Sequence, residues 1–257
     1  MASTTALPAD IRLMNTLSAV LWAALGLASL VLVLAWAARL PLFAIRAISI
    51  DGDVSRNSVS TIRANALPHL SGNFFTLDLK QGRRAFEAVP WVRSAVVHRV
   101  WPNRLAVRLE EHRPVAQWGE DKLVNALGEV FEANLGDVED DHLPTLAGPE
   151  GTAAQALALL RRLAPVLARL ELRIEQLTLS GRGSWHVELD SGAEIELGRG
   201  SEDEVVARTE RFTATVTQVV SRYQRPIEYA DLRHNEGYAL RLRGVSTTLL
   251  PAAAKKN

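Results

Sequence analysis

The chain has 257 residues, and its 29 lysines and arginines balance its 29 aspartates and glutamates. This neutral balance argues against nucleic acid as the main partner, because proteins that bind polyanions carry a basic excess. The chain contains no cysteine, which excludes disulfides and thiolate metal sites. Its shares of charged residues (23%) and of hydrophobic residues (47%) are those of a globular protein and argue against global disorder.

The first predicted element is a membrane-spanning helix over Leu13–Ala38, a run without any charged residue. At about 1.5 Å per residue this helix is roughly 39 Å long, which exceeds the hydrocarbon core of about 30 Å. A cleaved signal peptide is the alternative, because Ala35-Trp36-Ala37 resembles a small-x-small cleavage site, but the apolar run far exceeds a signal sequence. The flanking lysines and arginines do not decide the orientation. The short tail of residues 1–12 favours a cytoplasmic N-terminus and places the rest of the chain across the membrane.

The next segment, residues 43–111, predicts a small module of helices and strands. Alternating apolar residues indicate strands, and proline or glycine marks the points where elements end. Two β-branched runs joined by a Pro-Asn turn read as a hairpin. In chain order we expect a strand over Phe43–Ile50, a turn at Asp51-Gly52, a helix from Ser58 to Pro68, a strand over Asn73–Leu79, a helix over Gln81–Ala88, and a hairpin of Trp91–Val100 and Arg104–Glu111.

Residues 114–245 predict a second module, in which mostly antiparallel strands carry flanking helices. We expect a helix over Thr152–Ala164 with a break or kink at Pro165, because an interior proline costs about 3 kcal/mol. Ser201 and Glu204 form a capping box for a later helix, although the β-branched run from Thr213 could also be a strand. The expected strands are Ile174–Leu179, Trp185–Leu189, Ala193–Leu197, Ile227–Leu232 and Gly237–Leu242, and residues 246–257 read as a flexible tail.

Five stretches carry a resemblance to a known family, and their order and spacing after a single span make it specific. They are Pro90–Trp118 (PWVRSAVVHRVWPNRLAVRLEEHRPVAQW), Lys122–Phe131 (KLVNALGEVF), Leu143–Gly148 (LPTLAG), Ser184–Gly200 (SWHVELDSGAEIELGRG) and Tyr229–Arg233 (YADLR). Over residues 13–245 the chain resembles the FtsQ family of bitopic cell-division proteins of Gram-negative bacteria. The resemblance implies an α+β chain with a single N-terminal transmembrane helix, a POTRA domain at 43–111 and a β domain at 114–245.

The search for catalytic, cofactor or metal sites finds no candidate residues. The six histidines are scattered and form no metal-ligand motif. The acidic run Asp137, Glu139, Asp140, Asp141 and His142 lacks the alternating spacing of a calcium loop and reads as a surface loop. The glycine turns at 181–184 and 198–201 match neither a nucleophile elbow nor a phosphate-binding loop. We therefore expect a non-enzymatic protein without a small-molecule substrate or cofactor; a membrane-anchored periplasmic envelope hydrolase, with catalytic residues assembled from distant positions, is the alternative.

The resemblance implies a scaffold at the division septum that links early and late divisome proteins. It implies an inner-membrane protein with a cytoplasmic N-terminus and a periplasmic C-terminal domain, which binds the membrane proteins FtsB and FtsL. Confinement to one membrane raises the effective concentration of such weak binders.

The last strand is the predicted partner-binding surface. A terminal hairpin strand is a natural sheet edge, and Gly237–Leu242 contains no proline that would prevent strand addition. The alternative is that Arg243 and the tail cover this edge. The resemblance implies that Arg182 and Arg233 contact FtsB carboxylates and leaves in doubt the stacking contact at His234, where the family has an aromatic residue. The predicted partner-binding residues are Arg182, Tyr229, Leu232, Arg233, His234, Glu236, Gly237, Tyr238 and Leu240.

Overall fold

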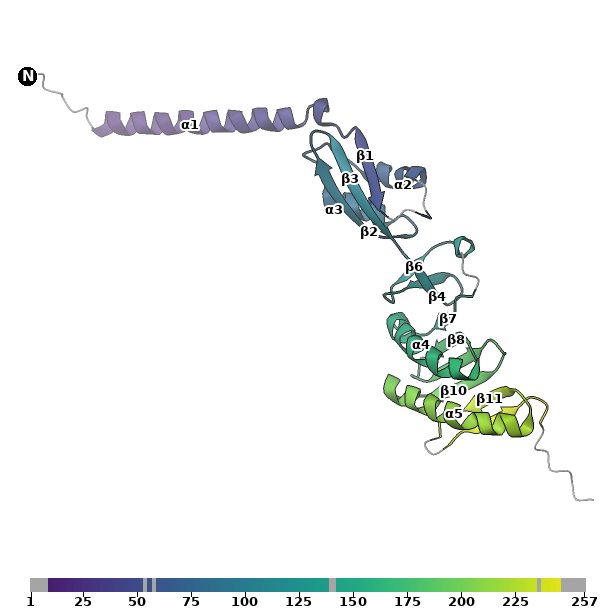
Figure 1. The fold of residues 1–257 in the computed structure, drawn as a ribbon. Helices are drawn as coiled ribbons and strands as arrows, with labels where there is room; N and C mark the ends of the chain where they lie inside the picture. Colours follow the sequence, from purple (N-terminus) through teal and green to yellow (C-terminus); the bar gives the residue numbers. More distant parts are fainter. Residues whose placement is uncertain (1–8, 53–54, 57–58, 139–141, 235–236, 246–257) are drawn as a thin grey trace, which may run out of the picture. The chain divides into compact units, whose positions relative to one another are not determined.

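The computed structural model describes residues 9–52, 55–56, 59–138, 142–234 and 237–245. The chain divides into two units, Met1–Glu111 and His112–Asn257. The first unit begins with helix α1 (Ala9–Ala38), drawn in purple in Figure 1. Its segment Leu13–Ala38 has the length and hydropathy of a membrane span, and none of it is buried in protein. The helix therefore fits the predicted single-pass anchor.

The remainder of the first unit packs two helices against a three-stranded sheet. The elements are β1 (Ala47–Gly52), α2 (Val59–Ala66), α3 (Leu79–Glu87), β2 (Val92–Val100) and β3 (Arg104–Glu111). The sheet order is β1-β3-β2, with β1 parallel and β2 antiparallel to β3. Alternate residues of β3 point inward, so that Val107 and Leu109 pack with Ile62 of α2 and Phe86 of α3. The predicted hairpin is confirmed as β2 and β3, and the other face of β3 carries the exposed side chains of Arg104, Arg108 and Glu110.

The first strand prediction in this unit, Phe43–Ile50, is wrong at both ends. The chain makes a 3-10 turn at Pro41–Phe43, and β1 begins only at Ala47. Asp51-Gly52, expected as a turn, belongs to β1 and pairs with β3. Gly52 has a φ of +114° and lies against the Leu109 backbone, where a side chain would clash. Gly52, the last residue of β1, therefore allows a close approach of the two strand backbones.

The predicted strand over Asn73–Leu79 is also wrong. The Asn73 side-chain oxygen accepts hydrogen bonds from the N–H groups of Phe75 and Thr76, each at 3.0 Å. Asp78 accepts from the Lys80 N–H at 2.8 Å and caps α3. These side chains satisfy the backbone locally and favour a turn over a sheet ladder. The preceding helix ends at Ala66 and continues as a 3-10 turn, Leu67–His69, that includes Pro68; its predicted start, Ser58, lies outside the described residues.

The second unit is built on a nine-stranded sheet within the described residues. Its strands are β4 (Pro114–Trp118), β5 (Lys122–Asn125), β6 (Val130–Glu132), β7 (Thr145–Ala147), β8 (Ile174–Leu179), β9 (Trp185–Leu189), β10 (Glu194–Gly198), β11 (Ile227–Asp231) and β12 (Ala239–Leu242). The order is β12-β11-β10-β9-β8-β7-β4-β5-β6. Five neighbouring pairs are antiparallel and three are parallel. The α+β class is confirmed, and β12 and β6 are the two edges.

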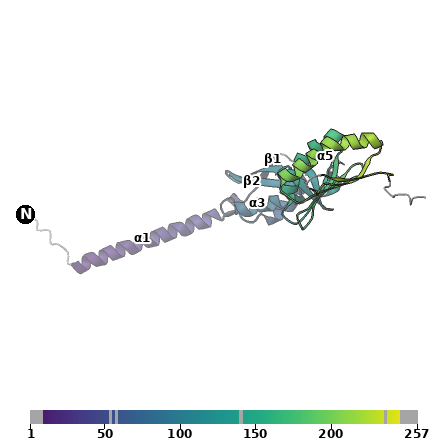
Figure 2. The same ribbon diagram turned by 90° about the horizontal axis from the view of Figure 1, so that it is seen from below.

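Helices α4 (Ala153–Leu167) and α5 (Glu202–Tyr223) pack with the sheet in one core. Figures 1 and 2 show α5 running along one side of the strands. The capping box at Ser201 and Glu204 is confirmed, and the run from Thr213 is helical because Phe212 and Val216 share its buried stripe. Of the predicted break or kink at Pro165, the break is wrong, because α4 continues through this residue. Pro165 is exposed in the last turn of α4, so water can hydrogen-bond to the backbone carbonyl that would otherwise accept the N–H that proline lacks. The next residues, Val166 and Leu167, are buried in the core and keep this turn helical.

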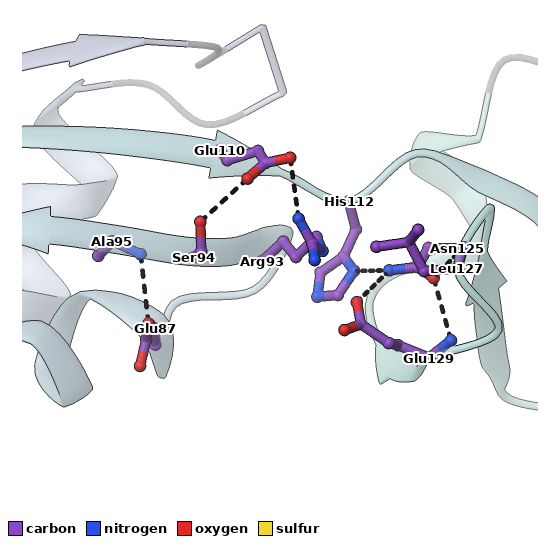
Figure 3. Close-up of polar contacts among 9 residues, drawn as sticks. All are labelled: Glu87, Arg93, Ser94, Ala95, Glu110, His112, Asn125, Leu127 and Glu129. Carbon is purple, nitrogen blue, oxygen red and sulfur yellow. Dashed lines mark hydrogen bonds and ion pairs between the residues drawn. The ribbon is translucent and has the colours of Figure 1, made fainter.

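The stretch Lys122–Phe131 forms β5, a turn and most of β6. Asn125, which is buried, organises the turn between them: its side-chain oxygen accepts the N–H groups of Leu127 and Glu129 at 2.9 and 3.0 Å (Figure 3). Its amide nitrogen donates to the Glu129 carboxylate at 2.6 Å and lies 3.0 Å from His112 Nδ1. The His112 ring stacks on Phe131, with centroids 4.0 Å apart. The start of the second unit is thereby fixed to this hairpin.

Candidate partner-binding site

Strand β12, the last strand along the chain, lies at one edge of the sheet, as predicted. The Leu232 N–H donates to Glu196 of β10 at 2.8 Å, so the backbone groups of Ala230 and Leu232 face β10. By alternation, Tyr229 and Asp231 face β12, where they pair with Arg241 and Ala239. The intervening residue of β12, Leu240, therefore directs its N–H and C=O away from the sheet. These are the groups that a further strand would bind.

Among the described residues no strand pairs with the outer edge of β12, and its side chains are held to the core. Leu242 is buried, and Leu240 and Tyr238 are half-buried against the core. The Tyr238 ring packs edge-on against Phe212 of α5, with centroids 5.0 Å apart at 87°. The Thr215 hydroxyl donates to the Tyr238 hydroxyl at 3.1 Å. The edge strand is thus pre-ordered, which reduces the entropy that a partner strand would lose on binding.

Arg233 and Asp231 form a fork at the end of β11. Arg233 Nε and Nη2 donate to the two Asp231 oxygens at 2.9 and 2.6 Å, and the Arg233 N–H adds a third bond at 3.0 Å. The Asp231 side chain is 12% exposed, whereas that of Arg233 is 56% exposed. The hydrogen bond from Arg233 lowers the pKa of Asp231 to about 2, and the pairing raises the pKa of Arg233. The guanidinium has more N–H donors than Asp231 uses, so an incoming carboxylate could bind it as well.

Acidification is expected to remove the stabilisation that Asp231 gives the second unit. Its carboxyl pKa falls from the usual 3.8 to about 2 in the folded state. Because the folded pKa is the lower one, the stabilisation is complete above the unfolded pKa and is lost as the pH falls through the folded pKa. Thermal melts of the full chain and of Asp231→Asn should differ at about pH 6 and converge toward about pH 2. A difference that stays constant over this range would contradict the ion-pair explanation.

Two adjoining cavities connect this fork with α5. The first, of about 610 Å³, and the second, of about 670 Å³, share Arg208 and Arg211 of α5 as lining residues. The first is also lined by Leu232, His234, Gly237 and Tyr238, and the second by Arg182, Arg199, Glu204 and Arg233. We call the second cavity the basic groove. It brings together Arg182 and Arg233, which are far apart in the sequence.

The basic groove is lined by five arginines and one glutamate, which favours an acidic occupant. Arg208 is fixed within it, because its guanidinium donates to the backbone carbonyls of Leu197, at 2.8 Å, and Arg199. Arg211 is exposed. The sequence interpretation missed Arg199, Arg208 and Arg211. The available signal was the pair of arginines three positions apart on the polar side of the capped helix, but nothing local indicated that they face Arg182.

The other predicted site residues fall in different environments. Leu232 is 2% exposed and belongs to the core. It lines the first cavity, so a partner would contact it only by entering that cavity. Tyr229 is half-buried beneath Arg241, whose guanidinium carbon lies 5.4 Å from the ring centre; burial raises the Tyr229 pKa. His234 and Gly237 are exposed. Glu236 lies outside the described residues.

The alternative in which Arg243 and the tail cover the edge receives only partial support. The Arg243 N–H donates to Pro226 at 3.0 Å, and its guanidinium donates to the Ser191 carbonyl at 3.4 Å. Arg243 is therefore directed toward the neighbouring strands. Residues 246–257 lie outside the described part of the chain.

Ion-binding chemistry has no candidate among the described residues. No group of three or more His, Asp or Glu side chains there is placed to hold a metal ion. His186 Nδ1 lies 3.3 Å from the Glu196 carboxylate, in a pair that joins β9 and β10. Glu139, Asp140 and Asp141 of the acidic run lie outside the described residues. The described residues of the second unit thus present an edge strand and, near it, a groove lined mainly by arginines.

Comparison with known proteins gives two family matches and several relatives that are similar over most of the chain. The family described as POTRA domain, FtsQ-type, matches residues 43–112, and the family described as Cell division protein FtsQ/DivIB, C-terminal, matches residues 116–233. The second match ends at Arg233, so β12 lies beyond it. Proteins named Cell division protein FtsQ are 43% identical in Burkholderia pseudomallei (92% of this chain, 94% of the relative) and 41% in Thiomonas arsenitoxydans (93% and 90%). That of Bordetella pertussis is 39% identical over 89% of both chains.

Proposed function

Because the chain belongs to the FtsQ family and so has a role in cell division, we propose that it is a non-enzymatic scaffold that links early and late divisome proteins. Its proposed partners are FtsB and FtsL. The observation that carries the proposal is the open edge of β12 beside the basic groove. One surface offers backbone groups for a strand and guanidinium groups for carboxylates, and neither requires catalysis.

In the proposed complex, an extended FtsB segment adds to the sheet beside β12. Leu240 supplies the outward N–H and C=O groups, and the alternate side chains of the added strand lie over the two faces of the sheet. Acidic residues of the same segment bind Arg233 and Arg182. Arg233 keeps its bonds to Asp231 and uses its remaining donors, so a carboxylate joins an existing fork instead of breaking it.

We also propose that the chain lies in the inner membrane at the division septum, with the N-terminus cytoplasmic and residues 43–245 periplasmic. The apolar helix α1 supports the anchor, and the family supports the compartment. A scaffold and partners that are anchored in the same membrane diffuse in two dimensions, which raises their effective concentration for one another. A modest affinity at β12 is then sufficient for assembly.

Binding of FtsB is expected to protect the backbone amide of Leu240 from hydrogen exchange. This N–H faces the open edge in the free protein and would be hydrogen-bonded in the complex. The measurement is hydrogen exchange of the full chain in lipid nanodiscs, with and without a soluble FtsB periplasmic segment. Strand β6, the other edge of the same sheet, is the internal control and should not change. Protection at β6, or an unchanged Leu240 with bound FtsB, would contradict strand addition at β12.

A further inference from the structure

The C-terminal end of α1 continues directly into a short, apolar turn. Leu13–Ala38 is 26 residues long, or roughly 39 Å, whereas the hydrocarbon core is about 30 Å thick. The last residues of the helix therefore reach the headgroup region. Pro41–Phe43 follows within a few residues, so this turn lies at the same depth. Leu42, in the middle of the turn, is 67% exposed.

A second segment is attached at this level by hydrogen bonds. The Asn73 side-chain amide donates to the carbonyl of Ala38, the last residue of α1, at 2.6 Å. The Phe74 N–H donates to the Phe43 carbonyl at 2.9 Å. The Asn73 turn that replaces the predicted strand thus brings Phe74 and Phe75 to the end of the membrane span.

These contacts assemble an aromatic cluster. The Phe75 ring packs edge-on against Phe43 and Phe74, with centroids 4.9 and 5.3 Å apart. Despite these ring contacts, Phe75 is 51% exposed, and it belongs to neither of the two hydrophobic cores. We call Leu42, Phe43, Phe74 and Phe75 the aromatic foot. Exposed rings and aliphatic side chains beside a span are favoured at the membrane interface, where aromatic residues concentrate.

Two exposed arginines flank the foot along the chain. Arg39 follows α1 immediately, and Arg46 precedes β1, with its N–H bonded to Asn103 of the β2–β3 turn at 3.0 Å. Cations beside interfacial aromatic residues are attracted to anionic lipid headgroups. Apolar contact and charge therefore point to the same occupant, a lipid surface.

We propose that the aromatic foot inserts into the membrane–water interface of the bilayer. This insertion holds the folded part of the first unit against the membrane surface. The proposal is independent of partner binding by the second unit. It assigns a role to the loop around Asn73 that packing within the protein does not explain. It also sets the distance from the membrane at which this module presents its surfaces.

The absence of cysteine allows a direct test with single-cysteine reporters in the full chain. Phe75→Cys carries an environment-sensitive fluorophore at the foot, and Val96→Cys, on β2 and similarly exposed at 47%, is the matched control. The proteins are placed in nanodiscs of phosphatidylethanolamine and phosphatidylglycerol that contain nitroxide-labelled lipid. The label at position 75 should show blue-shifted emission and quenching by nitroxides on the headgroup and upper acyl chain. The label at position 96 should show neither.

A second substitution separates insertion from simple tethering to α1. Leu42→Asp places a charge on an exposed side chain of the foot and should abolish acyl-chain quenching at position 75, whereas Val96→Asp should leave it unchanged. An unquenched label at position 75 in the parent protein would overturn the proposal and would favour a protein occupant for the foot. Quenching that survives Leu42→Asp would also overturn it, because proximity to the anchor would then be sufficient.

Discussion

Replacing Arg182 and Arg233 together by glutamate is expected to weaken FtsB binding by about a hundredfold. Each substitution removes a cation from the basic groove and adds a charge that repels an acidic segment. A tenfold loss for each corresponds to about 1.4 kcal/mol, and separate contacts add approximately. The measurement is titration calorimetry of the full chain in nanodiscs with the FtsB periplasmic segment, at fixed ionic strength.

The controls for this experiment distinguish lost binding from lost folding. Arg222→Glu reverses an equivalent charge in the last turn of α5 and should bind FtsB normally. Arg233→Glu also places a carboxylate beside Asp231, so its thermal melt is compared with that of Arg182→Glu, whose side chain is exposed on a turn. Normal affinity in the double variant, with an unchanged melt, would move the partner surface away from the basic groove.

Local patterns were sufficient to predict most elements of both units. The alternation along Arg104–Glu111 gave β3 and its buried face, and the Ser201 and Glu204 pair gave the start of α5. The edge position of β12 was also predicted, because a strand that ends a domain has few partners left to pair with. In each case the decisive contacts lie between residues close in sequence or follow from chain order.

The errors arose where nonlocal contacts or side-chain hydrogen bonds decided the structure. Apolar residues around Asn73 suggested a strand, but the Asn73 side chain closes a turn and bonds to the end of α1. Pro165 suggested a break, but core packing continues α4 past it. The basic groove joins Arg182 to α5 across the fold, and no spacing in the sequence encodes that encounter.

Phe212→Ala is expected to lower the free energy of unfolding of the second unit by about 3–5 kcal/mol, the usual cost of truncating a buried phenylalanine. Phe212 is 1% exposed and lies between the core of this unit and Tyr238, which precedes the edge strand. The cavity should therefore loosen β12 as well as the core, and FtsB binding should weaken. Hydrogen exchange of the full chain in nanodiscs measures both effects, because the slowest amides of β9 and β10 report unfolding of the unit and those of β12 report local opening.

Two variants separate the loss of packing from the loss of polar contact. Phe212→Leu keeps most of the side-chain volume and should cost less than about 1.5 kcal/mol. Tyr238→Phe keeps the edge-on ring and removes only the hydrogen bond from Thr215, which is exposed and should contribute about 1 kcal/mol or less. If β12 exchanged as slowly in Phe212→Ala as in the parent protein, the Tyr238 contact would not be what orders the edge. Strand β12 would then owe its order to Leu240 and Leu242 packing on the core, and partner binding should survive the substitution.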